Sequence, residues 1–361
     1  MILIDGNQGE GGGQIIRTAL ALSCLTGKPF KATNIRGGRE NSGLKAQHVA
    51  AIKALKKFCN AKTDGDEIGS KKLLFIPGKI TAKNIVVDVG TAGSMPILLQ
   101  AIILPCIFAN KTHTITFIGG TDVSNSASID YFHYVILPYF KQLANIELKI
   151  LKRGYYPKGQ GKIELTIKPK IKLSQYNNFE DFLTELQQYA FQAIQQGKLI
   201  QIKGISHASI NLETAQVAER QATAAEQLLK NLGVPINIRV EYAQTESKGS
   251  GITLWAVCTT QKNDLAKSHI FGADALGEQG KPAELVGSEA AQQLLETLNS
   301  KTPIDAHLAD NLMPLIALCR PSEIVVQQIT PHTKTNIAIA EKFLGQCFKI
   351  NGKAISTVVL N

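Results

Sequence analysis

The sequence predicts an α/β fold built from repeated units. The first eighty residues alternate apolar, strand-like segments with helices whose apolar residues recur every three or four positions, and the next eighty repeat that order. Both units place a small, glycine-containing loop before their first helix, GEGGG and then GTAGS, and a Gly-Gly pair after their central strand. The C-terminal part supplies the later half of a third unit. We therefore expect a large domain of three βαβαββ-type units over 1–180 and 304–361, with a smaller α/β domain inserted at 181–303.

The expected elements follow in chain order. In the first unit we expect strands over 2–5, 30–35, 61–65 and 72–76 and helices over 14–25 and 44–58. In the second we expect strands over 85–89, 113–119, 146–151 and 162–167 and helices over 96–109 and 129–143. The third has helices over 308–319 and 334–344 and strands over 323–329, 348–350 and 355–360, with its opening strand placed at 171–173. The insert has strands over 199–204, 236–242, 252–259 and 267–271 and helices over 215–232 and 283–298.

Composition narrows the class of protein. The chain has 361 residues and a net charge of +10, which suits a nucleic-acid partner and equally suits any basic protein. Its longest apolar run, 95–109, is too short for a membrane helix, and no signal sequence opens the chain, so a cytoplasmic location is the expectation. The six cysteines lack C-x-x-C spacing and lie mostly in apolar runs, which favours buried free thiols over a metal cluster.

The glycine-rich loop within 4–17, IDGNQGEGGGQIIR, joins a strand to a helix. Such a loop presents backbone amides and a helix N-terminus, a combination that binds anions. It ends without the Gly-Lys-Ser/Thr of a Walker loop, and Gln14 replaces the last glycine of a dinucleotide motif. The segment therefore predicts an anion site without indicating which anion.

Basic and polar residues follow the central strand of the first unit. Arg36 and Arg39 come directly after that strand, and Gln47 and His48 begin the next helix. Arginine forks match phosphate oxygens, and Arg17 lies just beyond the glycine loop, so this group suggests a phosphate site. A solvated basic loop would show the same residues.

Two histidines near the C-terminus are candidates for chemistry. His307 and Asp310 share one helix face, which suits a metal or a nucleotide but also suits a helix capped by Asp305 with polar neighbours. His332 follows Pro331 at the expected start of a helix, whose positive end disfavours an imidazolium and leaves a neutral nucleophile able to attack an activated phosphate. An ordinary surface histidine is the alternative.

The other four histidines, His113, His133, His207 and His269, are assigned no role in chemistry.

Taken together, seven segments in order resemble the RNA 3′-terminal phosphate cyclases. They are IDGNQGEGGGQIIRTAL, IRGGRENSGLKAQH, GTAGSMPILLQ, GGTD, GYYPKGQG, HLADN and PHTKTNIAIAEKF. The resemblance implies the three-unit domain with an insert, and an ATP-dependent ligase that forms phosphoric esters with Mg²⁺ or Mn²⁺. In this family a histidine takes AMP from ATP and passes it to an RNA 3′-phosphate. The neighbouring 2′-hydroxyl then closes the 2′,3′-cyclic phosphate.

The resemblance also implies roles for individual residues. The adenylated histidine corresponds to His332, and the acidic residue on the metal side to Glu10. The nucleotide contacts correspond to Gln100, His307, Leu308, Ala309, Asp310 and Asn311. The RNA-phosphate contacts correspond to Arg17, Arg36, Arg39 and Gln47.

Three departures from the family pattern concern affinity rather than the reaction. Asn311 stands where the family usually has Gln, Ala127-Ser128 replaces a proline pair, and Ser42 and Ala46 replace residues near the RNA-phosphate loop. A non-catalytic, cyclase-like factor of ribosome biogenesis is the alternative function, but it lacks the nucleophilic histidine that His332 supplies here. Enolpyruvyl transfer would need six units and a longer chain.

Overall fold

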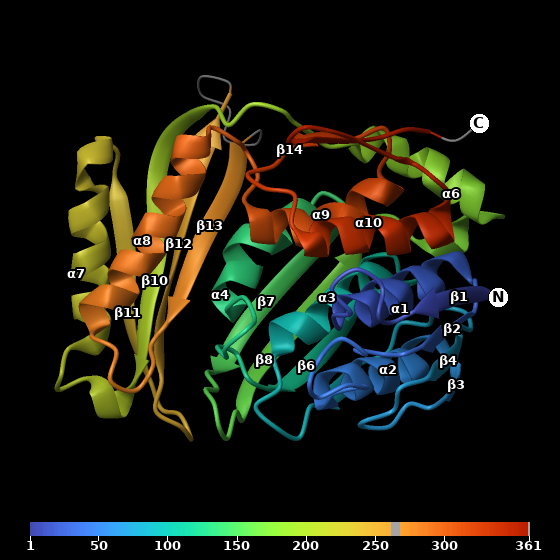
Figure 1. Cartoon of the computed structure of the whole chain (residues 1–361), viewed down its shortest axis with the longest axis horizontal. Coiled ribbons are helices and arrows are strands. Elements are labelled where there is room, and N and C mark those ends of the chain that lie inside the picture. The colour runs from blue at the N-terminus through green and yellow to red at the C-terminus, as the bar shows by residue number, and fades with distance from the viewer. Residues whose placement is uncertain (261–267, 360–361) are drawn as a thin grey trace.

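Three small sheets with the same strand order form the larger part of the molecule (Figure 1). The computed structural model describes residues 1–260 and 268–359. The sheets have the orders β1-β2-β4-β3, β5-β6-β8-β7 and β9-β14-β16-β15. In each, the first two strands are parallel and the other pairs antiparallel. The mixed α/β class and the repeat predicted from the sequence are confirmed, in topology as well as in element order.

The first two units contain the elements expected from the sequence, with bounds shifted by a few residues. The first has β1 (Ile2–Asp5), α1 (Gln14–Thr26), β2 (Phe30–Thr33), α2 (Ala46–Cys59), β3 (Lys62–Asp64) and β4 (Leu73–Ile76). The second has β5 (Ile85–Asp88), α3 (Met95–Ile107), β6 (His113–Gly119), α4 (Ile129–Tyr131), the π-helical turn η1 (Phe132–Ile136), α5 (Leu137–Phe140), β7 (Ala144–Lys152) and β8 (Gly161–Pro169). The helix expected over 129–143 is thus a run of three parts, and Pro138, which has no N–H to donate, is the second residue after the π turn.

The insert divides the third unit. β9 (Gln192–Ala193) precedes it, and α9 (Ala306–Leu318), β14 (Glu323–Val325), α10 (Pro331–Leu344), β15 (Phe348–Asn351) and β16 (Ala354–Thr357) follow it. The opening strand predicted at 171–173 is wrong, because β9 is the strand that pairs in parallel with β14. Two residues are too few to show an alternating pattern. Helix α6 (Phe179–Leu186) lies between β8 and β9, and Leu360, expected to end the last strand, lies outside the described residues.

The insert is a four-stranded sheet with two helices on one face (Figure 1). Its sheet has the order β11-β10-β12-β13, made of β10 (Lys198–Ser209), β11 (Ile236–Ala243), β12 (Ser250–Thr259) and β13 (Ser268–Leu276), and its helices are α7 (Val217–Leu229) and α8 (Ala283–Ser300). Sheet and helices share a hydrophobic core of their own that includes Leu254, Phe271 and Leu294. Lys267, expected to begin the last strand, lies outside the described residues. The predicted domain bounds stay a prediction, and residues 192–193 of the predicted insert pair with the third sheet.

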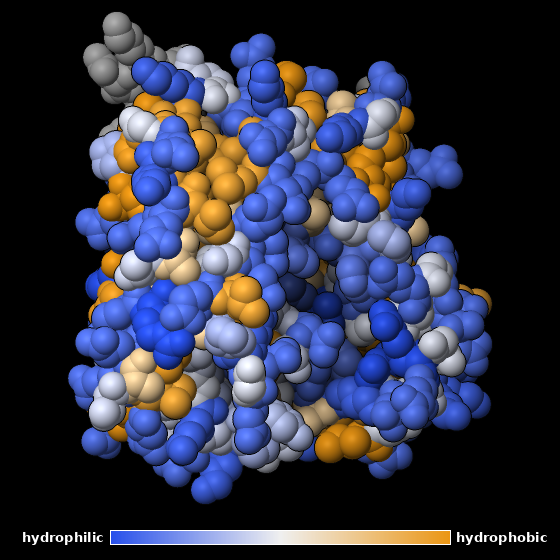
Figure 2. All heavy atoms as spheres, turned by 60° about the vertical axis from the view of Figure 1, so that its left-hand side comes forward, coloured by the Kyte–Doolittle hydropathy of each residue, from blue (hydrophilic) through white to orange (hydrophobic). Residues whose placement is uncertain are grey.

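The helices of the three units pack against one another between the sheets. α1 contacts α2, α3 and α10, and α10 also contacts α9. Their facing side chains, such as Ile15, Leu20, Leu99 and Ile316, are fully buried. Among the described residues, no helix has the length and apolarity needed to cross a membrane. The face shown in Figure 2 is mostly hydrophilic around a hollow near its middle.

Candidate active site

One cavity of about 850 Å³ collects residues from the start of helices in all three units. Its wall is formed by Gly13 and Gln14 at α1, Gln47 and His48 at α2, Ile97 and Gln100 at α3, Asn125 to Ala127 before α4, His307 and Asp310 at α9, and His332 and Asn336 at α10. A helix start leaves backbone N–H groups without intrahelical partners and carries the positive end of the helix dipole. Six helix starts around one cavity therefore favour a ligand with several negative charges.

This cavity brings together most of the residues singled out from the sequence. Those that line it are Arg17, Arg36, Arg39, Gln47, Gln100, His307, Asp310, Asn311 and His332. Leu308 and Ala309 instead pack in the core, because positions directly after His307 turn toward the opposite side of α9. Asp305 caps α9 by accepting the Leu308 N–H at 2.8 Å, so the capping role considered for it is also present.

The glycine loop before α1 has backbone angles that other residues resist. Gly9 and Gly11 have φ of +60° and +58°, in the left-handed region. At Gly13 a Cβ atom would collide with the His48 ring. Gly13 is also the N-cap of α1 and provides no capping side chain, so the first-turn N–H groups of this helix are left for another partner.

The three cavity arginines have few acidic partners. Arg39 lies 3.5 Å from Glu10, whereas Arg17 and Arg36 form no ion pair within the part of the chain that the structure describes. Burial, and secondarily Arg36, lowers the pKa of Arg17 to about 10. Burial and the charge of Arg39 likewise lower the pKa of Arg36. Arg17 and Arg36 are cations that lie close together without an ion-pair partner among the described residues, which favours a polyanionic ligand.

His48 contributes a neutral hydrogen-bond donor beside these arginines. Its Nδ1 accepts the Lys45 backbone N–H at 3.0 Å, which assigns the ring proton to Nε2. Burial, followed by the charges of Arg17, Arg36 and Lys45, lowers the pKa of His48 to about 3. Its Nε2 is buried without a hydrogen-bond partner, as is the amide nitrogen of Gln14. Both donors are available to a ligand.

His332 stands in the first turn of α10. The helix begins at Pro331 rather than at the expected residue 334, because Thr330 caps it and proline suits the first helical position. The Nε2 atom of His332 lies 3.0 Å from Glu10 Oε2. Asp310 Oδ1 accepts hydrogen bonds of 2.6 Å from the hydroxyls of Thr330 and Thr333, which fixes the start of α10 to α9.

The sequence profile of the family described as RNA 3′-terminal phosphate cyclase matches residues 8–350. The chain belongs to this family. It is 44% identical over 355 residues to the RNA 3′-terminal phosphate cyclase of Pyrococcus furiosus, with 98% of this chain and 96% of that protein covered. It is 44% identical over 358 residues to that of Saccharolobus solfataricus, covering 98% and 97%. It is 42% identical over 357 residues to that of Archaeoglobus fulgidus, covering 98% and 99%. The resemblance read from the seven motifs is confirmed.

For the divalent metal expected in a cyclase of this family, Glu10 is the acidic residue beside His332. Its Oε2 atom is buried and accepts no hydrogen bond, although it lies within ionic contact of Arg39 and His332. Mg²⁺ commonly uses one or two carboxylates and completes its shell with substrate phosphates and water. Glu10 is not among the residues that line the cavity but contacts two that are, Arg39 and His332, and a carboxylate in this position fits that pattern.

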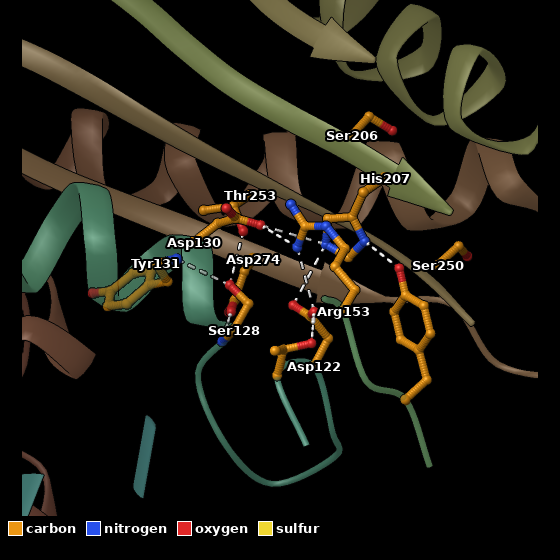
Figure 3. Close-up of polar contacts among 12 residues, drawn as sticks. Asp122, Ser128, Asp130, Tyr131, Arg153, Ser206, His207, Ser250, Thr253 and Asp274 are labelled. Atoms are coloured by element: carbon orange, nitrogen blue, oxygen red, sulfur yellow. Dashed lines mark hydrogen bonds and ion pairs between the residues drawn. The ribbon is translucent and has the colours of Figure 1, made fainter. Parts of the chain in front are cut away.

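A second group of charged and polar residues lies where the insert meets the large domain (Figure 3), and all of its members except the half-buried Glu241 are buried. We call it the interdomain cluster; it consists of Asp122, Asp130, Arg153, Tyr155, His207 and Glu241. Arg153 donates to Asp130 at 2.7 Å, to Asp122 at 3.4 Å and to Glu241 at 3.1 Å. His207 Nδ1 is 2.8 Å from the Tyr155 hydroxyl, and its Nε2 is 3.5 Å from Asp122. The cluster joins β10 and β11 of the insert to the large domain.

This cluster has the composition of a metal site but already contains its own cation. Ligand atoms of Asp122, Asp130 and His207 lie within 4.8 Å of one another. The Arg153 guanidinium contacts both carboxylates and supplies positive charge where an ion would. We therefore assign the cluster to domain contact. Sequence reasoning missed it, and gave His207 no role, because its members come from segments far apart in the chain.

The insert also reaches the cavity. Among the described residues that line it, Asp274 of β13 is the one that the insert contributes. Its carboxylate accepts the backbone N–H of Ser128 at 2.5 Å, directly beside the cavity residues Ser126 and Ala127. Nothing in the local sequence marks Asp274, since its partner lies 146 positions away.

Proposed function

We propose that this protein uses ATP to convert RNA 3′-phosphate ends to 2′,3′-cyclic phosphates through a histidine–AMP intermediate. The observation that carries the proposal is the position of His332. It lies in a cavity lined by three arginines and six helix starts, with its Nε2 beside Glu10. A nucleophile among unpaired cations suits displacement at a phosphorus that carries several negative charges. The relatives are named RNA 3′-terminal phosphate cyclases, and cyclisation of a terminal phosphate is a displacement at phosphorus.

In the first step His332 attacks the α-phosphorus of ATP. A nitrogen–phosphorus bond forms, the bond from the α-phosphorus to the bridging oxygen breaks, and pyrophosphate leaves. Glu10, 3.0 Å from Nε2, orients the ring, and its negative charge stabilises the positive charge that develops on the imidazole as the bond forms. When bound at Glu10, Mg²⁺ or Mn²⁺ supplies neutralisation of charge on the phosphates.

In the second and third steps the AMP group passes to RNA. An oxygen of the RNA 3′-phosphate attacks the phosphorus on His332 and releases the histidine, which forms an RNA–adenylate anhydride. The 2′-hydroxyl then attacks the 3′-phosphorus, loses its proton to solvent, and expels AMP. We assign Arg36, Arg39 and Gln47 to the RNA phosphate and Arg17 to the reacting phosphates. Gln100, His307, Asp310 and Asn311 are assigned to the nucleotide.

The state of the cysteines bears on the location of the protein, although the proposed reaction uses none of them. All six are free, and each is buried. Because disulfides are rare in reducing compartments, we place the reaction in the cytoplasm.

Labelling with ATP carrying ³²P at the α-phosphate tests the nucleophile. We expect wild-type protein with Mg²⁺ to form an acid-labile, base-stable adenylate, and His332→Ala to form none. His307→Ala is the matched control: because His307 is assigned to nucleotide binding and not to the covalent step, this variant should need more ATP but still form the adenylate at saturating ATP. Full labelling of His332→Ala would show that another residue is the nucleophile. Absence of label on the wild type would favour the non-catalytic, cyclase-like function.

The same assay separates the two substrates. Arg39→Ala should retain its adenylate label but transfer it poorly to an oligonucleotide with a 3′-phosphate. Equal loss of both steps would contradict the assignment of Arg39 to the RNA phosphate.

A further inference from the structure

We propose that Asp274 of the insert selects adenine by accepting a hydrogen bond from the exocyclic amine of the base. This inference rests on the proposed function, because it takes the cavity to be the ATP site. It assigns the insert a part in substrate recognition, in addition to its contact with the large domain through the interdomain cluster.

Strand geometry directs Asp274 toward the large domain. Successive side chains of a strand point to opposite faces of the sheet. Ala273 and Ala275, on either side of it in β13, belong to the hydrophobic core that the insert forms with α7 and α8. Asp274 therefore lies on the other face, where it meets the start of α4 and the cavity.

A short chain of hydrogen bonds holds the carboxylate in place (Figure 3). Asp274 Oδ2 accepts the Ser128 N–H at 2.5 Å, and the Ser128 hydroxyl is 2.8 Å from that of Thr253 on β12. Ser128 also caps α4 by accepting the Tyr131 N–H at 3.1 Å. Ser128 is the one hydrogen-bond donor to Asp274 within the described ranges 1–260 and 268–359, so the carboxylate keeps unused acceptor capacity.

The charges around the cavity orient a nucleotide within it. Asp274 forms no ion pair with the residues that the structure describes, and burial raises its pKa. The charged groups that act on it most are His307 and Asp122, whereas Arg17 and Arg36 are influenced by other cavity arginines. A triphosphate is repelled by Asp274 and attracted by the arginines, so the opposite end of the nucleotide, the base, faces Asp274.

The wall next to Asp274 suits the flat faces of a base. Phe132 and Ile136 follow Ser128 along the same helical run and line the cavity, as do Ile97 and Ile103 of α3. Apolar walls with a few fixed polar groups are typical of small-molecule sites. Here the fixed polar group is an acceptor.

An acceptor at this position distinguishes the two purines. Adenine carries an amino donor where guanine carries a carbonyl acceptor. A carboxylate facing guanine would oppose one acceptor with another and leave both desolvated without a hydrogen bond. The geometry thus favours ATP over GTP.

Removing the amine from the ligand tests this without any mutation. We would measure binding of AMP, purine riboside monophosphate and GMP by calorimetry, and adenylate formation with the matching triphosphates. Loss of one hydrogen bond to a charged group weakens binding by about 10- to 100-fold. We expect that loss for purine riboside monophosphate against AMP, and a larger loss for GMP. Equal affinity of the wild type for AMP and purine riboside monophosphate would overturn the proposal.

Two variants separate recognition from a structural role. Asp274→Asn should raise the KM for ATP with little change in kcat, and should lower the preference for AMP over both analogues by at least about tenfold. Thr253→Val is the control, because it removes the other contact of the insert with Ser128 but does not line the cavity. It should leave the preference unchanged.

If both variants weakened all three nucleotides equally, Asp274 would only position Ser128, and the proposal would be wrong. Failure of the proposed function gives a different result. In that case the wild type would form no adenylate with any triphosphate, whatever its affinity for the mononucleotides.

Discussion

The active-site cavity and the interdomain cluster both hold arginine, histidine and aspartate, yet their side chains are satisfied in opposite ways. In the cluster, Arg153 is almost fully buried and contacts three carboxylates. In the cavity, Arg17 and Arg36 have no carboxylate partner among the described residues, and donors of Gln14, Arg17 and His48 are buried without hydrogen bonds. The interdomain cluster pairs its charges within the chain, whereas the arginines of the cavity have positive charge that a bound anion could neutralise.

The pKa shifts follow this difference. In the cluster, burial opposes ionisation of Asp122, but His207 and Arg153 outweigh it and lower the pKa of its carboxyl. The charged forms of Asp122 and Arg153 therefore stabilise the fold together. In the cavity, burial and like charge lower the pKa values of Arg17 and His48, so the folded state disfavours their charged forms. Active sites commonly hold such destabilised groups.

The largest effect is expected in the cluster. Arg153→Met leaves the carboxylates of Asp122 and Asp130 buried without their cation, which should lower the free energy of unfolding by about 3–5 kcal/mol. Urea unfolding followed by far-UV circular dichroism measures this. The neighbouring Lys152→Met is the control, because Lys152 pairs with Glu246 at the surface and should change stability by less than about 1 kcal/mol. Similar losses for both variants would show that Arg153 is not the central cation of the cluster.

A matching change in the cavity should separate activity from stability. Arg17→Met should lower the rate of cyclisation by about 10²- to 10³-fold, as when one group that stabilises transition-state charge is removed. Its free energy of unfolding should stay the same or rise, because the folded state disfavours the Arg17 charge. Steady-state cyclisation and urea unfolding of the same preparation measure both. A loss of stability comparable to that of Arg153→Met would contradict the contrast between the two regions.

The sequence predicted the cavity better than the cluster, for a physical reason. Arg17, Arg36, Gln47 and His332 lie near helix starts with recognisable loop and capping residues, and the repeat brings those starts together. A contiguous motif also predicts contacts for Leu308 and Ala309, but the 3.6-residue turn of a helix points these two side chains into the core. The strand β9 was missed because two residues carry no period. His207 and Asp274 act through partners in other segments, so no local pattern marks them.

The smallest effect concerns pH, and His48 is the residue that produces it. The pKa of His48 is about 3 in the folded protein against 6.5 for an ordinary histidine. Between these values the unfolded chain binds a proton that the folded chain does not, so stability is lost as pH falls from 6.5 toward 3, at about 1.4 kcal/mol per pH unit.

His48→Gln cannot take up this proton. At pH 4.5 the wild type should therefore have lost about 2–3 kcal/mol more than His48→Gln, relative to pH 7, in urea unfolding. His307→Gln, at an exposed histidine of the same cavity, is the control and should follow the wild type. The pKa of Asp122 is lowered, so protonation of the cluster should reduce the free energy of unfolding only below the ordinary pH range of aspartate. As the pH falls, the loss of stability caused by His48 should therefore come first. Parallel pH curves for the wild type and His48→Gln would show that His48 is not held neutral by burial and the cavity cations.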